Sequence, residues 1–335
     1  MCFPVLIFIF RSGMFLRIVS MKSERSPCRT LTLPIIGRNA CVQRIKISFN
    51  SFSQKLASMR RPCRLDIRMS SNKNRHDHKQ VAEANRNLYN ISPEVSIDFQ
   101  QFADIPYVAS RVATTIEDCF TRLPAHHSVR VLDIGTGIGH LLAHIMSHAL
   151  AQNIFAIDIA ERNIEVARQR YPGVTFYIGD FLSDFPLPDK VELITAYSVL
   201  HHFADWAAFL NKADRLLNAG GILYLDHEPL DSLLARAYIS LARIKNRRHR
   251  DLLLAEYHQF HGYLDLFEVS RHLKAMNYQV DLYFTNLSLI GDIIKKTGIN
   301  LSSIIVQEML VNSKRKRILK QAFLSYKIIA QKLDA

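Results

Sequence analysis

The sequence has few cysteines, and its apolar runs are short. Only five residues are cysteine, and the four that precede residue 76, Cys2, Cys28, Cys41 and Cys63, form no Cys-x-x-Cys pair. This pattern predicts neither a disulfide framework nor a zinc site of the paired-cysteine type. The first apolar stretch has only about nine residues before Arg11, too few to span a membrane, and no basic segment precedes it as in a secretory signal. We therefore expect an intracellular protein with no membrane-spanning segment.

The positive charge is concentrated in the first 75 residues. This segment holds 15 of the 43 basic residues but only two of the 30 acidic ones, which leaves 28 of each sign in residues 76–335. A net charge of +13 ordinarily suggests a nucleic-acid partner, but residues 76–335 are formally neutral, so nucleic-acid binding is not expected there. Residues 1–70 are predicted to be a basic, disordered leader. Their composition fits an organellar transit peptide, and equally fits translated sequence upstream of a true start at Met59 or Met69.

A glycine-rich motif follows a strongly apolar run at residues 131–142, VLDIGTGIGHLL. The run ends in Asp133, and the helical pattern that begins after the last glycine suggests a strand, a tight turn and a nucleotide-facing helix. A dinucleotide fingerprint requires Gly-x-Gly-x-x-Gly, but His140 stands where its last glycine would be. An acid beside the turn also disfavours a pyrophosphate and suits a cationic ligand. The glycines of this turn are Gly135, Gly137 and Gly139.

The strand and helix patterns alternate along the rest of the chain, which predicts an α/β fold with a parallel sheet and helices on both faces. A last segment, FLSYKIIAQKL, alternates as expected for a strand inserted antiparallel beside the sixth, and it completes a predicted seven-stranded sheet. The expected strands after the first are Ile154–Asp158, residues 174–180, Val191–Ala196, Ile222–Asp226, Tyr278–Phe284 and residues 323–333, and the expected helices between them include His140–His148 and Glu161–Arg170.

On these residues the chain resembles the class I S-adenosylmethionine-dependent methyltransferases, whose acidic-x-Gly-x-Gly-x-Gly signature is matched position for position from Asp133 onward. The resemblance implies a seven-stranded Rossmann-like sheet and S-adenosyl-L-methionine as cofactor. It assigns the ribose hydroxyls to Asp158 and the adenine amino group to Asp180. The cofactor-binding residues that it implies are Asp133, Gly135, Gly137, Gly139, Asp158, Ile159, Asp180, Phe181 and Ser198.

Histidines follow the expected fourth and fifth strands. The LHHF pattern after the fourth strand is similar to small-molecule methyltransferases of the ubiquinone and menaquinone biosynthesis type. If the methyl acceptor is a hydroxyl or an activated carbon, a base is needed, and His202 and then His227 are the candidates. The alternative is that they only shape their loops.

A second set of histidines, His140, His144 and His148, recurs on one helix face. Such a face can ligate a metal, but no carboxylate joins these histidines at zincin spacing, so no metal is predicted. A partly exposed helix face is the alternative.

Two helical segments are expected around this core. Residues 78–122 are predicted to form an N-terminal lid, in which Tyr89 either reaches the site or only packs the helix on the sheet. Residues 229–276 are predicted to form a cap inserted after the fifth strand, with an amphipathic helix that ends in basic residues. Its cations suit an acidic acceptor or an anionic membrane surface, and a solvated helix end is the alternative.

The sequence thus predicts an S-adenosylmethionine-dependent methyltransferase, within residues 76–335, that acts on oxygen or carbon of a phenolic, quinone-like or lipid small molecule. We expect it in the cytoplasm, with possible peripheral contact to an anionic membrane, or in an organelle if the leader is a transit peptide. Methylation of RNA or protein, and a non-catalytic S-adenosylmethionine-binding module, are the alternatives. The loop at Ser198 lacks the Asn or Asp-Pro-Pro-aromatic box that holds planar amines, which disfavours nucleic-acid amino groups.

Overall fold

The structure is a computed structural model of the chain, and it divides into two compact units, Met1–Asn74 and Arg75–Ala335. In the first unit, β1 (Thr30–Ile36) and β2 (Val42–Ser48) pair antiparallel, a hairpin that the sequence did not predict. The rest of the predicted leader, and residues 237–263 of the predicted cap, lie outside the described residues. The structure describes residues 30–36, 42–48, 77–91, 103–123, 129–183, 186–236, 264–298, 308–311 and 320–334.

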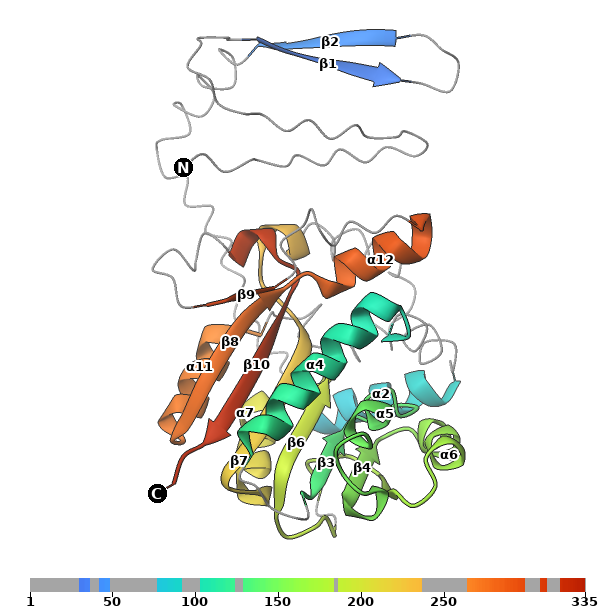
Figure 1. Cartoon of the computed structure of the whole chain (residues 1–335), viewed down its shortest axis with the longest axis vertical. Coiled ribbons are helices and arrows are strands. Elements are labelled where there is room, and N and C mark those ends of the chain that lie inside the picture. The colour runs from blue at the N-terminus through green and yellow to red at the C-terminus, as the bar shows by residue number, and fades with distance from the viewer. Residues whose placement is uncertain are drawn as a thin grey trace. The chain divides into compact units, whose positions relative to one another are not determined.

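The second unit is a mixed β-sheet with helices on both faces (Figure 1). Its strand order is β5-β4-β3-β6-β7-β10-β8-β9. The strands are β3 (Val131–Ile134), β4 (Ile154–Asp158), β5 (Thr175–Ile178), β6 (Val191–Tyr197), β7 (Leu217–Pro229), β8 (Tyr278–Thr285), β9 (Glu308–Leu310) and β10 (Ser325–Lys332). The helices are α2 (His78–Ile91), α4 (Pro106–Arg122), α5 (Leu142–Ile145), α6 (Glu161–Arg170), α7 (Trp206–Leu216), α11 (Leu266–Ala275) and α12 (Leu287–Thr297), with single 3-10 turns η1 (Ala151–Asn153), η2 (Leu200–His202) and η3 (Lys320–Ala322).

The sheet is parallel from β5 to β7 and antiparallel beyond β7. As predicted, β10 is inserted antiparallel between the fifth and sixth strands, β7 and β8. The prediction of seven strands is wrong, because the three-residue strand β9 adds an eighth at the edge by pairing antiparallel with β8. A strand of this length at the sheet edge is too short to show a periodic pattern in the sequence.

Apolar side chains of the central strands are buried on both faces, as expected for parallel strands covered by helices. One core lies beneath α4, α5 and α6, and α4 crosses the front of the sheet in Figure 1. The other core lies beneath α7 and α11. Because the strands are covered on both faces, polar groups of the central parallel strands reach solvent chiefly at strand ends. A binding site is therefore expected in the loops at these ends.

Two predicted helical segments differ from the structure. The expected helix His140–His148 contains only one regular α-helical turn, α5, and the residues around it form turns. Helix α11, predicted as part of the cap, instead packs on the sheet through Leu266, Val269 and Leu273. A helix with a buried apolar stripe cannot be assigned to a cap or to a sheet from its own sequence, because both surfaces select the same periodicity.

A β-bulge interrupts β7 near its end. Tyr326 of β10 pairs with Glu228, but Ile328 pairs with Leu225, so β7 holds one extra residue opposite Lys327. His227 accommodates the bulge with a left-handed backbone, φ 59°. Asp226 accepts a hydrogen bond from Tyr224 in the core beneath α4, whereas Glu228 accepts from the Val199–His201 loop on the other side. Because of the bulge, the side chains of Asp226 and Glu228 lie on opposite faces of the sheet, although residues two apart in a regular strand share a face.

Among the described helices, none is long and apolar enough to cross a membrane.

Candidate functional site

The glycine turn after β3 is held tightly on two sides and is open on the third. All three glycines have positive φ angles, and a Cβ on Gly135 would lie 2.4 Å from Val199 Cγ2. A Cβ on Gly139 would lie 2.5 Å from Tyr171 Cε2, whereas one on Gly137 would meet nothing within 4 Å. The outer glycines are therefore required by packing, and Gly137 faces a space in which a ligand can approach the backbone.

Asp133 lies beneath this turn with one carboxylate oxygen unsatisfied. Its side chain is 1% exposed, and Oδ1 accepts a hydrogen bond from Thr195 Oγ1 at 2.6 Å. Oδ2 is buried and has no hydrogen-bond partner among the described residues. Burial raises the pKa of Asp133 to about 6, against the opposing effects of the Thr195 and Thr136 hydroxyls. A buried acid of this kind favours a cationic or hydrogen-bond-donating ligand, because such a ligand satisfies the remaining oxygen.

Asp158, at the end of β4, joins the glycine turn to the next loop. Its carboxylate accepts hydrogen bonds from Gly137 N and Ala160 N, both at 2.8 Å, and from Asn163 Nδ2 at 3.3 Å. Because a carboxylate offers about four acceptor positions, one remains for a ligand hydroxyl. The structure therefore gives Asp158 a role in shaping the turn, which its position in the sequence did not reveal.

Asp180 follows β5 and is already paired within the chain. Its Oδ1 accepts from Leu182 N at 3.0 Å, and its Oδ2 lies 2.7 Å from Nε2 of His78, the first residue of α2. Burial alone would raise the pKa of Asp180, but the hydrogen bond from His78 holds it below its usual value.

The other residues predicted to bind the cofactor differ in exposure. Phe181 is 2% exposed and packs against Phe203 and Phe209, so its ring supports the wall of the site from within the core. Ile159 and Ser198 are half-buried. Ser198 has a left-handed backbone, φ 61°, and donates its N–H to the Asp226 carbonyl at 2.8 Å, which ties the loop after β6 to strand β7.

The two predicted catalytic histidines belong to different groups of rings. His227 stacks on Tyr197 at 5.2 Å between ring centroids, and its Nδ1 lies 3.4 Å from the Tyr197 hydroxyl. His202 lies in η2, with its ring 4.1 Å from that of His201 and edge-on to Tyr89 at 6.1 Å. The candidate lid residue Tyr89 therefore reaches one of the two candidate bases.

Of the three histidines expected on one helix face, His140 meets Tyr197 edge-on at 5.2 Å and has a pKa lowered to about 3, first by burial. His148 stacks on Phe120, and no group of three potential metal ligands occurs among the described residues.

Glu228 organises the loop that carries these histidines, a role that no sequence pattern indicates. It is fully buried and accepts hydrogen bonds from the backbone N–H groups of Val199, Leu200 and His201 at 2.8–3.0 Å. It also accepts one from His201 Nδ1 at 2.8 Å. Burial would raise the pKa of Glu228, but the His201 side chain and these hydrogen bonds lower it, so the buried group is ionised. No local motif links an acid to a loop 27–29 residues earlier.

Helix α2 lies across several of these loops. Its first residue, His78, pairs with Asp180 after β5, and its last turn brings Tyr89 to His202 after β6. Asn90 Oδ1 also accepts from Arg162 N at the start of α6, at 3.3 Å. The sequence predicts a lid within residues 78–122, and this stays a prediction; the structure shows that α2 contacts the loops after β5 and β6 and the start of α6.

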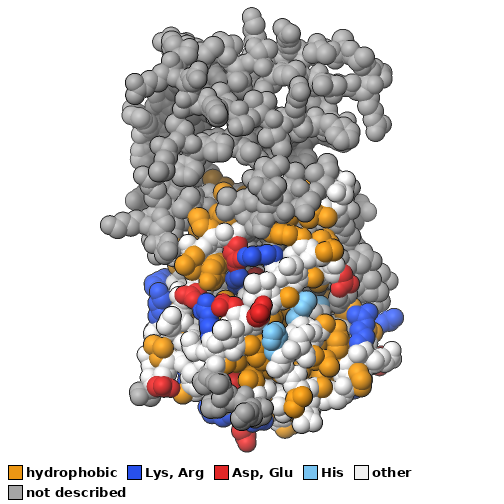
Figure 2. Space-filling model, viewed as in Figure 1, with side chains coloured by type: hydrophobic (Ala, Val, Ile, Leu, Met, Phe, Trp, Pro, Cys, Tyr) orange, Lys and Arg blue, Asp and Glu red, His pale blue; other side chains and the backbone are white. Residues whose placement is uncertain are grey.

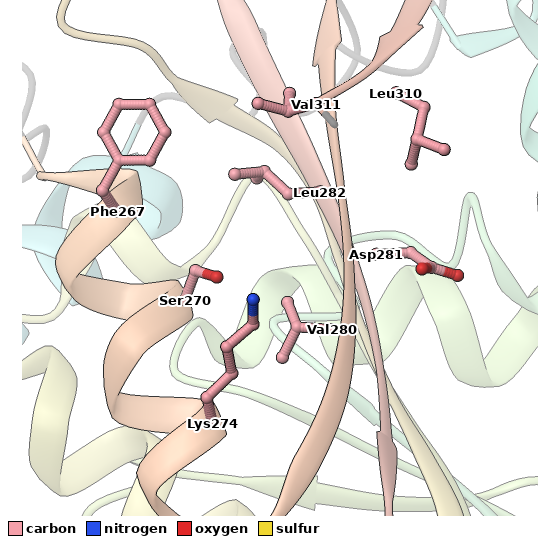
Figure 3. Close-up of a pocket in the computed structure, with 8 residues that line it drawn as sticks. All are labelled: Phe267, Ser270, Lys274, Val280, Asp281, Leu282, Leu310 and Val311. Atoms are coloured by element: carbon pink, nitrogen blue, oxygen red, sulfur yellow. The ribbon is translucent and has the colours of Figure 1, made fainter. Parts of the chain in front are cut away.

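A separate cavity lies away from these residues. It measures about 160 Å³ and is located between α11 and the edge strands β8 and β9, with Lys274 and Ser270 on its helical side (Figure 3). None of the predicted site residues lines it. On the face of Figure 2, acidic and basic side chains of the described residues are intermixed, in keeping with the neutral charge of residues 76–335.

Comparison with known proteins agrees with the fold and the glycine turn. Residues 132–225 match a family described as methyltransferase domain. A probable S-adenosylmethionine-dependent methyltransferase of Mycolicibacterium smegmatis is 32% identical over 28% of this chain and 35% of its own length. The chloroplastic 2-methyl-6-phytyl-1,4-hydroquinone methyltransferase 1 of Oryza sativa is 29% identical over 30% of this chain and 31% of its own length.

A solved structure shows the same fold. Phosphoethanolamine N-methyltransferase 2 of Haemonchus contortus, in complex with S-adenosyl-L-methionine, superposes with a TM-score of 0.52 at 13% identity, over 75% of this chain and 60% of that one. The family match therefore covers residues 132–225, and the sheet order and the acidic glycine turn agree with it. The chain spans only about a third of the length of the curated relatives described above.

Proposed function

We propose that this protein is an S-adenosylmethionine-dependent methyltransferase that methylates oxygen or carbon of a small-molecule acceptor. The observation that carries the proposal is the site beneath the glycine turn, where the buried Asp133 keeps an unsatisfied oxygen and Gly137 faces open space. A cofactor with a cationic end and an adenosine end fits both features. The family match over residues 132–225 supports the same assignment.

The residues divide between the parts of the cofactor. Asp133 faces the cationic amino-acid end, Asp158 accepts one ribose hydroxyl at its remaining position, and Asp180 accepts from the adenine amino group. Ile159, Phe181 and Ser198 shape the walls between them. When bound, S-adenosylmethionine supplies a methyl carbon that is already electrophilic, so the protein chiefly has to align the acceptor and exclude water.

The acceptor is proposed to lie between the loops after β6 and β7. Burial and Asp226 raise the pKa of Tyr197 well above its usual value, so Tyr197 stays protonated and donates to His227 Nδ1. With Nδ1 accepting from Tyr197, Nε2 of His227 is left to donate to the acceptor oxygen and orient it. His202 is left as the candidate base, and Glu228 acts as a positioning residue through the loop that carries it.

A neutral aromatic acceptor suits the groups at this end of the site. The His140 imidazole stays neutral because burial lowers its pKa to about 3, and the Tyr197 phenol stays neutral because burial raises its pKa. A phenolic or quinone-like ring can stack on such groups without bringing a charge into a buried region. The match to a hydroquinone methyltransferase supports this acceptor class.

We also propose a cytoplasmic or organellar location, with α2 acting as the lid and residues 229–263 as the cap.

The experiment that tests the proposal is calorimetric titration of the full chain with S-adenosylmethionine and S-adenosylhomocysteine, with NADH as the control. We expect micromolar binding of the first two and none of NADH. Binding of NADH alone, or of none of the three, would contradict the cofactor assignment. Transfer of a labelled methyl group to a panel of phenols, hydroquinones and carboxylic acids then tests the acceptor class, and transfer only to carboxylic acids would contradict the aromatic assignment.

A further inference from the structure

His78 makes two contacts at the place assigned to adenine. Its Nε2 lies 2.7 Å from Asp180 Oδ2, the carboxylate proposed to accept from the adenine amino group. Its ring also stacks on Phe203, with an interplanar angle of 11° and 5.8 Å between the ring centroids. A flat ring that bonds a carboxylate at its edge and stacks on an aromatic face engages the site as a purine base would.

We propose that His78 is an internal competitor of the cofactor, and that the first turn of α2 must leave Asp180 before adenine can bind there. This inference rests on the proposed function, because it takes Asp180 as the adenine acceptor. It gives α2 a regulatory role, since the population in which His78 is released determines how tightly the cofactor binds.

The geometry of the contact suits a group that can be displaced. Nδ1 of His78 is buried and has no hydrogen-bond partner among the described residues, so the closed position leaves one ring nitrogen unsatisfied. His78 is also the first residue of its helix, and helix ends open more readily than helix centres. At the other end of α2, Tyr89 and Asn90 keep their contacts with His202 and Arg162. The first turn can therefore open while the helix stays attached.

The charges around His78 strengthen the closed position in acid. The hydrogen bond to Asp180 raises the pKa of His78, burial opposes the shift, and Asp77 before α2 and Asp205 before α7 raise it further. Lys212 of α7 lies over the Phe181 ring and lowers the pKa of Asp180. Protonated His78 pairs with the ionised Asp180 more strongly than neutral His78 does. Release of His78, and with it cofactor binding, is therefore expected to increase as the pH rises.

The first test compares the affinity of the full chain for S-adenosylhomocysteine in the wild type, His78→Ala and Lys79→Ala. Lys79 is the exposed neighbour of His78 in the same turn, so its variant controls for a general effect on the helix. If the closed state holds about nine-tenths of the molecules, His78→Ala tightens binding about tenfold and reduces its dependence on pH between 6 and 8. Lys79→Ala changes neither.

Equal or weaker affinity in His78→Ala, beside a wild type that binds, overturns the competitor role and leaves the proposed function standing. Absence of binding in both overturns the proposed function, and the competitor role with it.

A second test uses the wild type alone and covers the case in which the variant fails to fold. The amides of Gln80 and Val81 bond to the Asp77 carbonyl in the closed first turn. If S-adenosylhomocysteine displaces His78, hydrogen exchange at these two amides accelerates on binding, while exchange near Tyr89 does not. Slower exchange at Gln80 and Val81 on binding would show that the turn stays closed, and would overturn the proposal.

Discussion

The two sides of the candidate site are built in different ways. On the cofactor side, each functional group lies at or just after the end of the strand that presents it, and its main contacts are local, as when Asp158 accepts a hydrogen bond from Gly137 N. On the acceptor side, the loop with His201 and His202 depends on Glu228, which lies beyond α7, near the end of β7. Local spacing therefore encodes the cofactor side, whereas only the folded sheet assembles the acceptor side. Substitutions on the cofactor side should therefore chiefly lower cofactor affinity, whereas substitutions on the acceptor side should chiefly lower stability or methyl transfer.

The largest expected effect is on the cofactor side, in Gly137→Val. A β-branched residue is strained at the φ of 55° found there, and its side chain would fill the open space beside the turn. We expect S-adenosylhomocysteine affinity to fall at least about a hundredfold, or roughly 3 kcal/mol, with the circular dichroism of the fold retained.

Gly298→Val is the matched control for Gly137→Val. Gly298 also has a positive φ and open surroundings, but it ends α12, a helix that holds none of the proposed site residues, so this variant should lose stability without losing affinity. Retained affinity in Gly137→Val would contradict the position of the cofactor.

The same division explains what the sequence could predict. Strand β4 and helix α6 have the predicted bounds, because a buried strand and an amphipathic helix each leave a periodic trace over several residues. Strand β9 leaves no such trace in three residues, and the bulge at His227 adds one residue without a glycine to mark it. Of the site, Asp133, the glycines, Asp158 and Asp180 could be proposed from their spacing together with the family resemblance. The role of Glu228 could not, because it depends on how β7 pairs with β10.

On the acceptor side, Glu228→Gln should chiefly destroy stability. The amide retains one acceptor oxygen but places an NH₂ group among backbone and imidazole donors, so buried N–H groups of residues 199–201 lose their partners. Breaking a buried ionic network of this kind costs about 3–5 kcal/mol.

Chemical denaturation at pH 7.5 measures the cost of Glu228→Gln, with Glu192→Gln, at the opposite end of the sheet, as the control. In preparations that remain folded, the affinity for S-adenosylhomocysteine should fall less than methyl transfer does. An unfolding free energy equal to that of the wild type would show that Glu228 does not organise the loop.

Asp133→Asn tests the cofactor side through the pH dependence of the free energy of unfolding. Burial raises the pKa of Asp133 from 3.8 to about 6, so the folded state binds a proton that the unfolded state releases. The contribution of Asp133 to stability is present below pH 4 and declines as the pH rises through 6, by roughly 3 kcal/mol in all. Asn keeps an oxygen to accept from Thr195 but does not titrate. The stability of the variant should therefore not decline over this pH range.

Denaturation at pH 4.5 and 7 measures the difference between wild type and Asp133→Asn. At pH 7 the variant should unfold less readily but bind S-adenosylhomocysteine more weakly, because the carboxylate charge is absent. A pH dependence identical to that of the wild type would contradict the buried, protonated acid.

The smallest expected effect is on the acceptor side. It distinguishes the contribution of the His227 backbone to stability from that of its ring to methyl transfer. Since a left-handed residue other than glycine is strained, His227→Gly should be more stable than His227→Ala by about 1 kcal/mol. At Glu83, an exposed position in the middle of α2, the order should reverse, with alanine more stable than glycine by a similar amount. Denaturation of the four variants measures both differences. Greater stability of His227→Ala would contradict the bulge in β7.

If the ring orients the acceptor, both His227 variants lose methyl transfer but keep their affinity for S-adenosylhomocysteine, whereas Glu228→Gln also loses stability.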